Sequence, residues 1–261
     1  MALGAAKEWV WCVAALLCAP LAFSGAAAPD VRVDPSRGLP GRESLTYAIE
    51  WRLIAAGRAQ LDWAARDAGF EASLKLESTG LVSTLFRVND TYSARLRRDL
   101  CSLTSHIDAQ EGRRRRDTNI TFNPDAGKAS YVEKDLVRNT VTASQQIDIP
   151  PCVHDIVGGL YKLRTLQLEP GQNAQVPVSD GKKSVSARVE AQQREDVRTP
   201  AGTFKTVRYE AFLFNDVLYR RSAHLYVWLT DDARKLPVQI RIRMQLTVGT
   251  ITLQLEKEQH S

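Results

Sequence analysis

The sequence is poor in the residue patterns that mark catalytic and metal sites. It contains no G-x-S-x-G motif, phosphate-binding loop or dinucleotide fingerprint. The adjacent carboxylates Asp231 and Asp232 are typical of a turn. Four histidines show no spacing typical of metal ligands: His106, His154, His224 and His260. We therefore expect no metal, no cofactor and no catalytic residue, and favour a non-enzymatic protein.

Cysteine is also scarce, and half of it lies near the N-terminus. Of the four cysteines, Cys12 and Cys18 fall within the first 28 residues, which leaves Cys101 and Cys152. An even pair in an exported chain predicts a disulfide, and the alternative is two separate buried thiols. The bridge would close a loop of about 50 residues and stabilise the fold by roughly 4 kcal/mol.

Long apolar runs are confined to the start of the chain. Trp9 to Phe23 has the length of a signal-peptide core, and Ala26-Ala27-Ala28 fits a cleavage site before Pro29. An uncleaved anchor is the alternative. No later segment is apolar enough to span a bilayer as a helix. The sequence predicts a signal peptide over residues 1–28, export to the periplasm, and no integral membrane segment after cleavage.

Charge of either sign is spread widely, with one exception. The chain carries 35 basic and 30 acidic residues and a net charge of +5, which does not indicate nucleic-acid binding. The exception is the run Arg113, Arg114, Arg115 and Arg116. It could bind the phosphate groups of a lipid or a polysaccharide, or it could be a solvated hairpin near a sheet edge.

Alternating apolar and polar residues predict that the chain is all-β and mainly antiparallel. From Val238 to Leu246 every second residue is apolar, and between them lie Gln and Arg. The same pattern recurs from Glu43 onwards, separated by turn residues. We expect about eleven or twelve strands in a single β domain over residues 43–257, preceded by a flexible tether over residues 29–42.

Two segments depart from this alternation. Residues 151–166 carry apolar side chains at three- and four-residue spacing, which predicts one amphipathic α-helix beginning near Pro151. Leu81 to Phe86 is apolar without alternation and suggests a short helix or loop beneath the sheet. Sequential hairpins with one packed helix predict a strongly curved meander sheet, either a half-open or a closed β-barrel.

Several short motifs carry a family resemblance. They are Cys152-Val-His-Asp155 before Leu160-Tyr-Lys-Leu-Arg164, Thr199-Pro-Ala-Gly-Thr-Phe204, Val227-Trp-Leu-Thr-Asp-Asp232, Leu236-Pro-Val238 and Gly249-Thr250. Over Glu43 to Glu256 the chain resembles the bacterial family catalogued as domain of unknown function 3108. The resemblance implies an exported envelope protein with an antiparallel β fold, and it brings no assigned activity. The expected shape is also analogous to that of lipoprotein-carrier half-barrels.

Aromatic residues supply the candidate binding site. Tyr47, Trp51, Trp63 and Trp228 could line the concave face of a curved sheet, or they could be ordinary core. Our leading hypothesis is an envelope protein that binds an amphipathic, lipid-like ligand or a glycolipid. One alternative is an envelope-assembly factor that contacts a protein partner. A second is a hydrolase acting on cell-wall or lipid material.

Overall fold

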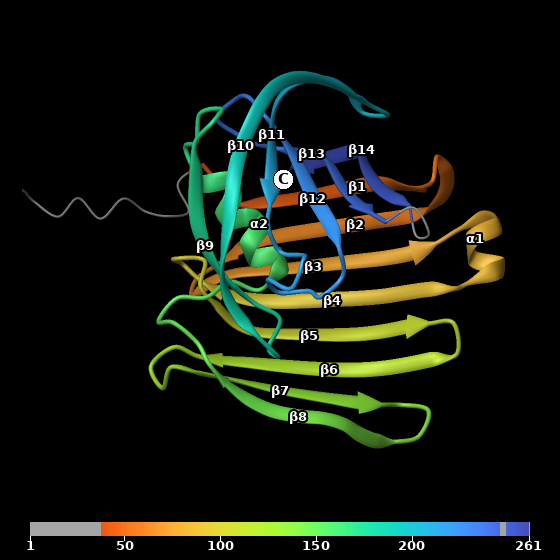
Figure 1. Cartoon of the computed structure of the whole chain (residues 1–261), viewed down its shortest axis with the longest axis vertical. Helices are drawn as coiled ribbons and strands as arrows, with labels where there is room; N and C mark the ends of the chain where they lie inside the picture. Colours follow the sequence, from red (N-terminus) through yellow and green to blue (C-terminus); the bar gives the residue numbers. More distant parts are fainter. Residues whose placement is uncertain (1–37, 246–248, 261) are drawn as a thin grey trace, which may run out of the picture. The chain divides into compact units, whose positions relative to one another are not determined.

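The computed structural model describes residues 38–245 and 249–260. All of them belong to the second of two units into which the chain divides, Met1–Val33 and Asp34–Ser261. The expected signal peptide, its cleavage site and most of the expected tether lie outside the described residues. Within them the protein is all-β, with fourteen antiparallel strands in one sheet and two helices (Figure 1).

The elements follow each other along the chain in an unbroken series of hairpins, interrupted by the two helices. They are β1 (Arg42–Trp51), β2 (Ile54–Arg66), β3 (Gly69–Ser78), α1 (Gly80–Leu85), β4 (Val88–Arg97), β5 (Ser102–Glu111), β6 (Arg114–Asn123), β7 (Lys128–Asp135), β8 (Thr140–Asp148), α2 (Ile156–Thr165), β9 (Asn173–Ser179), β10 (Ser184–Thr199), β11 (Gly202–Ala211), β12 (Ala223–Thr230), β13 (Pro237–Met244) and β14 (Thr250–His260).

The first and last strands meet in the middle of the sheet. The strand order is β8-β7-β6-β5-β4-β3-β2-β1-β14-β13-β12-β11-β10-β9, so the two edges come from the middle of the chain. In the described part, β8 and β9 do not pair with each other, and the sheet is open. The all-β, antiparallel prediction is confirmed, and of the two forms expected the open one is observed.

An antiparallel meander places alternate connections at opposite ends of the sheet. The β1–β2, β5–β6 and β7–β8 turns lie at the same end as α1, which we call the α1 end. The β2–β3, β4–β5 and β6–β7 turns lie at the other end, which we call the α2 end, because α2 packs there (Figure 1).

The helix α2 begins at Ile156, later than the sequence pattern suggested. Asp155 is the N-cap, and its carboxylate accepts a hydrogen bond from the Gly158 amide at 2.8 Å. It also accepts one from the Ser102 hydroxyl at 2.6 Å, while that hydroxyl accepts one from the Asp155 amide at 2.7 Å. Because Asp155 must be extended to cap the helix, Pro151 lies outside it.

A glycine allows α2 to approach the sheet closely. A Cβ atom on Gly158 would lie 2.6 Å from Cδ2 of Leu96 on β4, closer than any real contact. The segment before the helix also pairs with the edge strand β9: the His154 amide donates to the Pro177 carbonyl and the Ser179 amide donates to the His154 carbonyl. The helix and its leading segment are therefore fixed to both halves of the sheet.

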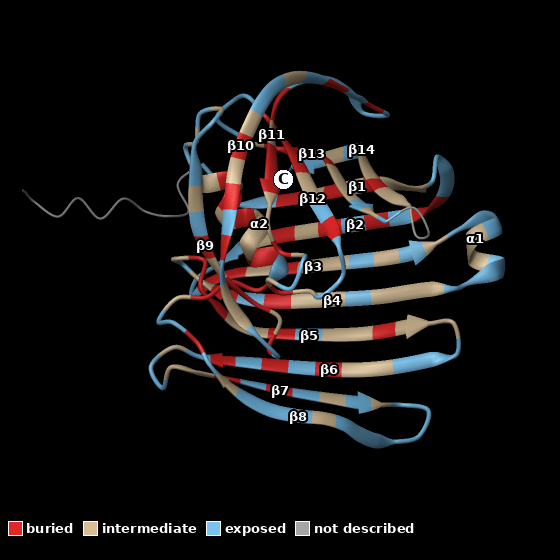
Figure 2. Cartoon of the chain, viewed as in Figure 1, coloured by how far each residue is buried: buried red, intermediate tan, exposed pale blue. Residues whose placement is uncertain are grey.

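The short helix α1 differs from α2 in burial. It is formed as the sequence suggested, but none of its residues is buried, and so it does not lie beneath the sheet (Figure 2). The buried residues gather instead on the inner face of the sheet and around α2, in three hydrophobic clusters. The expected position of α1 beneath the sheet was wrong. An apolar run without alternation does not indicate whether its side chains pack against the sheet or face solvent.

The disulfide predicted between Cys101 and Cys152 is present. The two Cα atoms are 5.1 Å apart and the residues are 51 apart in sequence. Cys101 follows the β4–β5 turn, and Cys152 precedes the segment that leads into α2. The bridge thus joins the sheet to the start of the helix.

Removing this bridge should lower stability. We expect the Cys101→Ser/Cys152→Ser variant to lose roughly 4 kcal/mol of unfolding free energy, because the unfolded chain regains the entropy of an open loop. Urea denaturation followed by circular dichroism measures this. Intact-mass analysis of the wild type after alkylation is the control, and two freely alkylated thiols in the native protein would contradict the bridge.

Candidate functional site

Rows of apolar side chains cross the inner face of the sheet. The strand register places residues opposite one another in a row across five strands: Leu45, Leu61, Leu74, Tyr92 and Ile107. A second row crosses the other half of the sheet: Ile49, Leu253, Ile240, Val227 and Tyr209. Cross-strand neighbours of this kind share one face, so both rows point inward.

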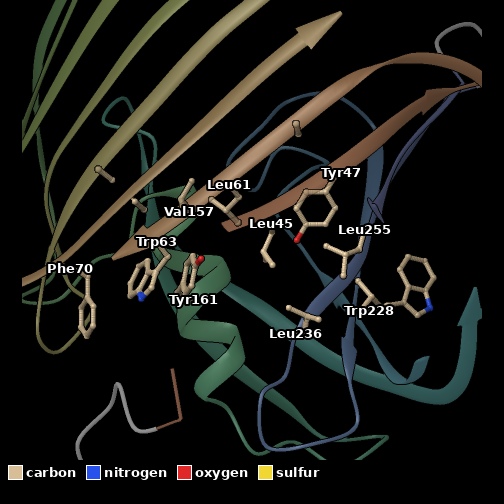
Figure 3. Packing of buried hydrophobic residues seen from close by; sticks show 14 of the residues in the cluster. Leu45, Tyr47, Leu61, Trp63, Phe70, Val157, Tyr161, Trp228, Leu236 and Leu255 are labelled. Carbon is tan, nitrogen blue, oxygen red and sulfur yellow. The ribbon is translucent and has the colours of Figure 1, made fainter. Parts of the chain in front are cut away.

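The α2 end of this face is filled by side chains. The Trp63 ring stacks on Tyr161 of α2 with centroids 3.7 Å apart and on Phe70 with centroids 4.7 Å apart (Figure 3). The Trp63 indole N–H donates to the Pro40 carbonyl at 3.2 Å. Trp63 is only 1% exposed. At this end the helix takes the volume that an open half-barrel would leave for a ligand.

Tyr47 and Trp228 belong to the same buried cluster as Trp63. The Tyr47 hydroxyl donates to the Pro237 carbonyl at 2.8 Å, and burial raises the pKa of this phenol. The Trp228 indole N–H donates to Glu195 at 2.8 Å, and Arg241 lies over its ring. The three side chains share one buried cluster and each has a protein partner, but Trp228 alternates with the inward-pointing Val227 and so lies on the opposite face of β12. That they contact a ligand stays a prediction.

Trp51 lies apart from this cluster, at the α1 end of β1. It is half-buried, and the Arg52 guanidinium lies 5.5 Å from the centroid of its ring. Nearby on the inner face, five large apolar side chains are packed against the core and yet only partly buried: Ile49, Leu74, Leu76, Tyr92 and Leu253. These positions were not among the site residues predicted from the sequence, because all of those were aromatic. The alternation in β1 and β3 already placed Ile49, Leu74 and Leu76 on the inner face.

A buried ion pair fixes α2 to β1. Both side chains are 1% exposed, and Arg164 donates to Glu43 through two nitrogens at 2.6 and 2.9 Å. The Tyr161 hydroxyl donates to the same carboxylate at 3.2 Å, and Arg164 also donates to the Arg234 carbonyl. A bidentate pair with further hydrogen bonds can offset the cost of burying two charges.

Breaking one side of this pair should be costly. We expect Glu43→Gln to lower the unfolding free energy by about 3–5 kcal/mol, because the Arg164 charge stays buried without its counter-ion. The Glu43→Leu/Arg164→Met variant removes both charges and should lose much less. Urea denaturation measures both, with Glu71→Gln in the exposed Arg66–Glu71 pair as control, where we expect a loss under about 1 kcal/mol. Equal losses for Glu43→Gln and the control would contradict this role.

His154 is buried beside the disulfide, away from the other histidines. Its Nδ1 lies 2.8 Å from the Leu100 carbonyl, which makes it the donor in a neutral ring. Burial lowers the pKa of this imidazole below its ordinary value of 6.5. His224 lies on β12 and contacts Glu210 at 2.7 Å. The two histidines share no hydrogen-bond partner among the described residues.

The lowered pKa of His154 predicts a pH dependence of stability. Above pH 6.5 the ring is neutral in both states and contributes no pH dependence. As the pH falls below 6.5, the imidazole is protonated in the unfolded state but stays neutral in the folded state. The unfolding free energy therefore decreases until the pH reaches the lowered pKa of His154 in the folded state. Urea midpoints at pH 8, 6.5 and 5.5 measure this decrease. His154→Gln should flatten that part of the profile, and an unchanged slope would refute the assignment.

The arginine run lies at the α1 end, in the β5–β6 turn and the start of β6. Arg113, Arg114 and Arg115 are exposed. Arg116 is half-buried and forms ion pairs with Glu111 and Glu133. The run therefore divides into three arginines that face solvent and one that holds neighbouring strands together. Binding of an anion by any of them stays a prediction.

The outer face carries a hollow of about 600 Å³ over β1 to β5. Small residues opposite one another in register form its floor, including Ser44, Ser73 and Ser93. His106 lies at its margin and contacts Asp117 at 2.6 Å. The hollow could accommodate a polar molecule, but its position on the convex side separates it from the apolar inner face.

Among the residues that the structure describes, two groups of side chains are spaced closely enough to hold a metal. Asp99, Cys101 and Cys152 form the first, where both thiols are used in the disulfide. Glu43, Glu258 and His260 form the second. In that group Arg164 already binds Glu43, and Arg234 lies 3.4 Å from Glu258. Arginine therefore balances the charge of the two carboxylates.

Neither α1 nor α2, the helices of the described part, is long and apolar enough to cross a membrane.

Comparison with protein families finds one match that covers most of the chain. The family model described as "Protein of unknown function (DUF3108)" matches residues 46–256. No curated protein matches the sequence.

Comparison with solved structures finds similar folds at low sequence identity. A beta-barrel-like protein of the DUF1849 domain from Brucella abortus has a TM-score of 0.55 at 9% identity, over 84% of this chain and 98% of its own. A protein from Bacteroides fragilis, provisionally described as exported with a YmcC-like fold, has a TM-score of 0.35 at 10% identity, over 84% and 96%. A protein from Parabacteroides distasonis, provisionally described as a lipoprotein, has a TM-score of 0.34 at 11% identity, over 85% and 98%. The first supports the β-barrel-like fold alone.

Proposed function

The chain belongs to the DUF3108 family of proteins of unknown function, and from this premise we propose that it is an exported, non-enzymatic envelope protein that binds an amphipathic, lipid-like ligand. The ligand lies on the inner face of the sheet, towards the α1 end. One observation carries the proposal: Ile49, Leu74, Leu76 and Leu253 pack against the buried core and remain partly exposed there.

Burial of apolar surface would drive ligand binding. Core side chains at the α2 end are covered by α2, whereas the neighbouring inner-face residues at the α1 end are covered only in part. Covering apolar surface is worth about 25 cal/mol per Å², or roughly 0.8 kcal/mol for each methylene group buried. An acyl chain laid along this face would gain that stabilisation, and its polar head would project at the α1 end. Trp51, from the sequence-based set, lies at that end.

Two features support export. The disulfide needs an oxidising compartment, such as the periplasm or a cell exterior. The first 28 residues have the composition of a signal peptide with a cleavage site at Ala28. The proposal places the mature protein in the periplasm.

A second candidate function rests on the edge strand β8. Most of its residues are exposed, and it carries a single charged residue, Asp148, and no proline. The opposite edge β9 is partly covered by the segment around His154. An uncovered polar edge can accept a strand from another protein. This geometry suits an envelope-assembly factor that acts through a protein partner.

Native mass spectrometry of protein purified gently from an exporting cell tests the ligand proposal. We expect a co-purifying mass of lipid size in the wild type. The Leu76→Gln/Leu253→Gln variant should lose this mass, because it places amides on the inner face. The matched control is Lys75→Gln/Glu77→Gln, which changes neighbouring side chains on the other face and keeps the net charge.

A bare protein mass in the wild type would refute the ligand proposal. Retention of the extra mass by the inner-face variant would place the ligand elsewhere, with the outer hollow as the next surface to alter. A mass that corresponds to a bound polypeptide would favour the β8 edge.

A further inference from the structure

Exposed apolar side chains are concentrated at one end of the sheet. Ten large apolar residues of the described part are exposed, and eight of them lie at the α1 end (Figure 2). They come from the β1–β2 turn, from α1 and its C-cap, and from the β7–β8 turn and the start of β8. They are Leu53, Ile54, Leu81, Leu85, Phe86, Leu136, Val137 and Val141. We call these residues and the arginines beside them the rim.

The β1–β2 turn shows most clearly that this exposure is unusual. Arg52 and Leu53 both have positive φ, 51° and 66°, in a two-residue hairpin turn. Such turns strongly prefer Asn-Gly, because other side chains are strained there. Leu53 is strained and also 91% exposed, so neither the fold nor solubility accounts for it. Leu85 and Val137 are 73% and 65% exposed at the other connections.

Positive charge accompanies the apolar tips. The β1–β2, α1, β5–β6 and β7–β8 connections and the first two residues of β6 contain six arginines, and β5 and β7 each end on a carboxylate. The arginines are Arg52, Arg87, Arg113, Arg114, Arg115 and Arg138. Both carboxylates already have partners: Glu111 pairs with Arg116, and Asp135 accepts from the amides of Val137 and Arg138 and lies 4.0 Å from the Arg138 guanidinium. The rim is therefore apolar and cationic at once.

We propose that the rim docks on the surface of an anionic phospholipid bilayer. The aliphatic tips enter the boundary between head groups and acyl chains, and the arginines bind lipid phosphates. Trp51 and Phe86 lie at the same end, where aromatic rings suit the interfacial zone. All these connections project from one end of a sheet whose strands run side by side, so they can meet a flat surface together (Figure 1).

A bilayer fits this arrangement better than a protein partner. The apolar residues come from separate connections along the sheet, with Arg87 and Arg113 to Arg115 between them. A fluid surface of mixed apolar and phosphate groups accommodates such spacing. The proposal goes beyond ligand binding on the inner face, because docking by the rim does not require a bound ligand.

Vesicle flotation tests the part of the proposal in which the arginines bind lipid phosphates. The purified wild type should bind vesicles of phosphatidylcholine and phosphatidylglycerol, and should bind pure phosphatidylcholine far more weakly. Arg113→Gln/Arg114→Gln/Arg115→Gln should weaken binding to the anionic vesicles on the order of 100-fold, at about fivefold for each arginine. Raising the salt concentration should also weaken binding of the wild type to the anionic vesicles, because salt screens the attraction between arginine and phosphate.

The matched control removes three cations at the α2 half of the sheet, Arg42→Gln/Arg98→Gln/Lys257→Gln, with the same change in net charge. Intact mass confirms that all samples have the same N-terminus. The control should bind nearly as the wild type does. An equal loss in the control would overturn the proposal, because binding would then follow net charge alone.

A second variant tests insertion of the tips. Leu53→Asn/Leu85→Gln/Val137→Thr alters only exposed side chains and should reduce anionic-vesicle binding at least tenfold. Brominated lipids should quench Trp51, whereas Trp63 and Trp228 are buried and serve as internal references. If the wild type fails to bind anionic vesicles, or binds without quenching Trp51, the proposal is wrong. If the wild type does not bind anionic vesicles, a protein partner becomes the next candidate to cover the exposed apolar residues of the rim.

Discussion

The structure depends on the docking of α2 against the inner face of an open sheet. Such a sheet has one apolar face that must be covered, and a single ten-residue helix covers only part of it. Asp155 and Ser102 fix the start of the helix, Gly158 brings it close to Leu96, and the Arg164–Glu43 pair fixes its end. Each contact lies at the α2 end, which is why the core is dense there.

The same constraint explains the asymmetry of the molecule. The α2 end holds the helix, the disulfide and the stacked rings of Trp63, Tyr161 and Phe70. The α1 end holds half-buried inner-face residues and the exposed rim. A protein that used its sheet only as a scaffold would have no reason to place Leu53 in a strained, exposed turn. Both proposed activities therefore lie at the end that the helix leaves uncovered.

The two proposals divide the chemistry of that end. The inner face offers mainly apolar side chains and suits an acyl chain, whereas the rim offers apolar tips with arginines and suits a lipid surface. They can operate together, since a ligand on the inner face would enter or leave at the end that meets the bilayer. They also stand separately, because the residues altered in their two tests do not overlap.

Much of the fold could be predicted from local pattern. Alternation along β1, β3 and β13 identified the all-β class, because side chains on a strand alternate between two faces. Three- and four-residue spacing identified α2, and the pairing of two cysteines in an exported chain identified the disulfide. The family resemblance was confirmed over residues 46–256.

What the sequence by itself determined, then, was the class of each segment and the face on which its apolar residues lie. Only the tertiary structure decided that Trp63 stacks on Tyr161, that Glu43 meets Arg164, and that tips distant in sequence share one end. The physical reason is that alternation is a local property of the backbone. The choice between a filled core and an open binding face depends instead on which segments, far apart in the sequence, come to lie against each other.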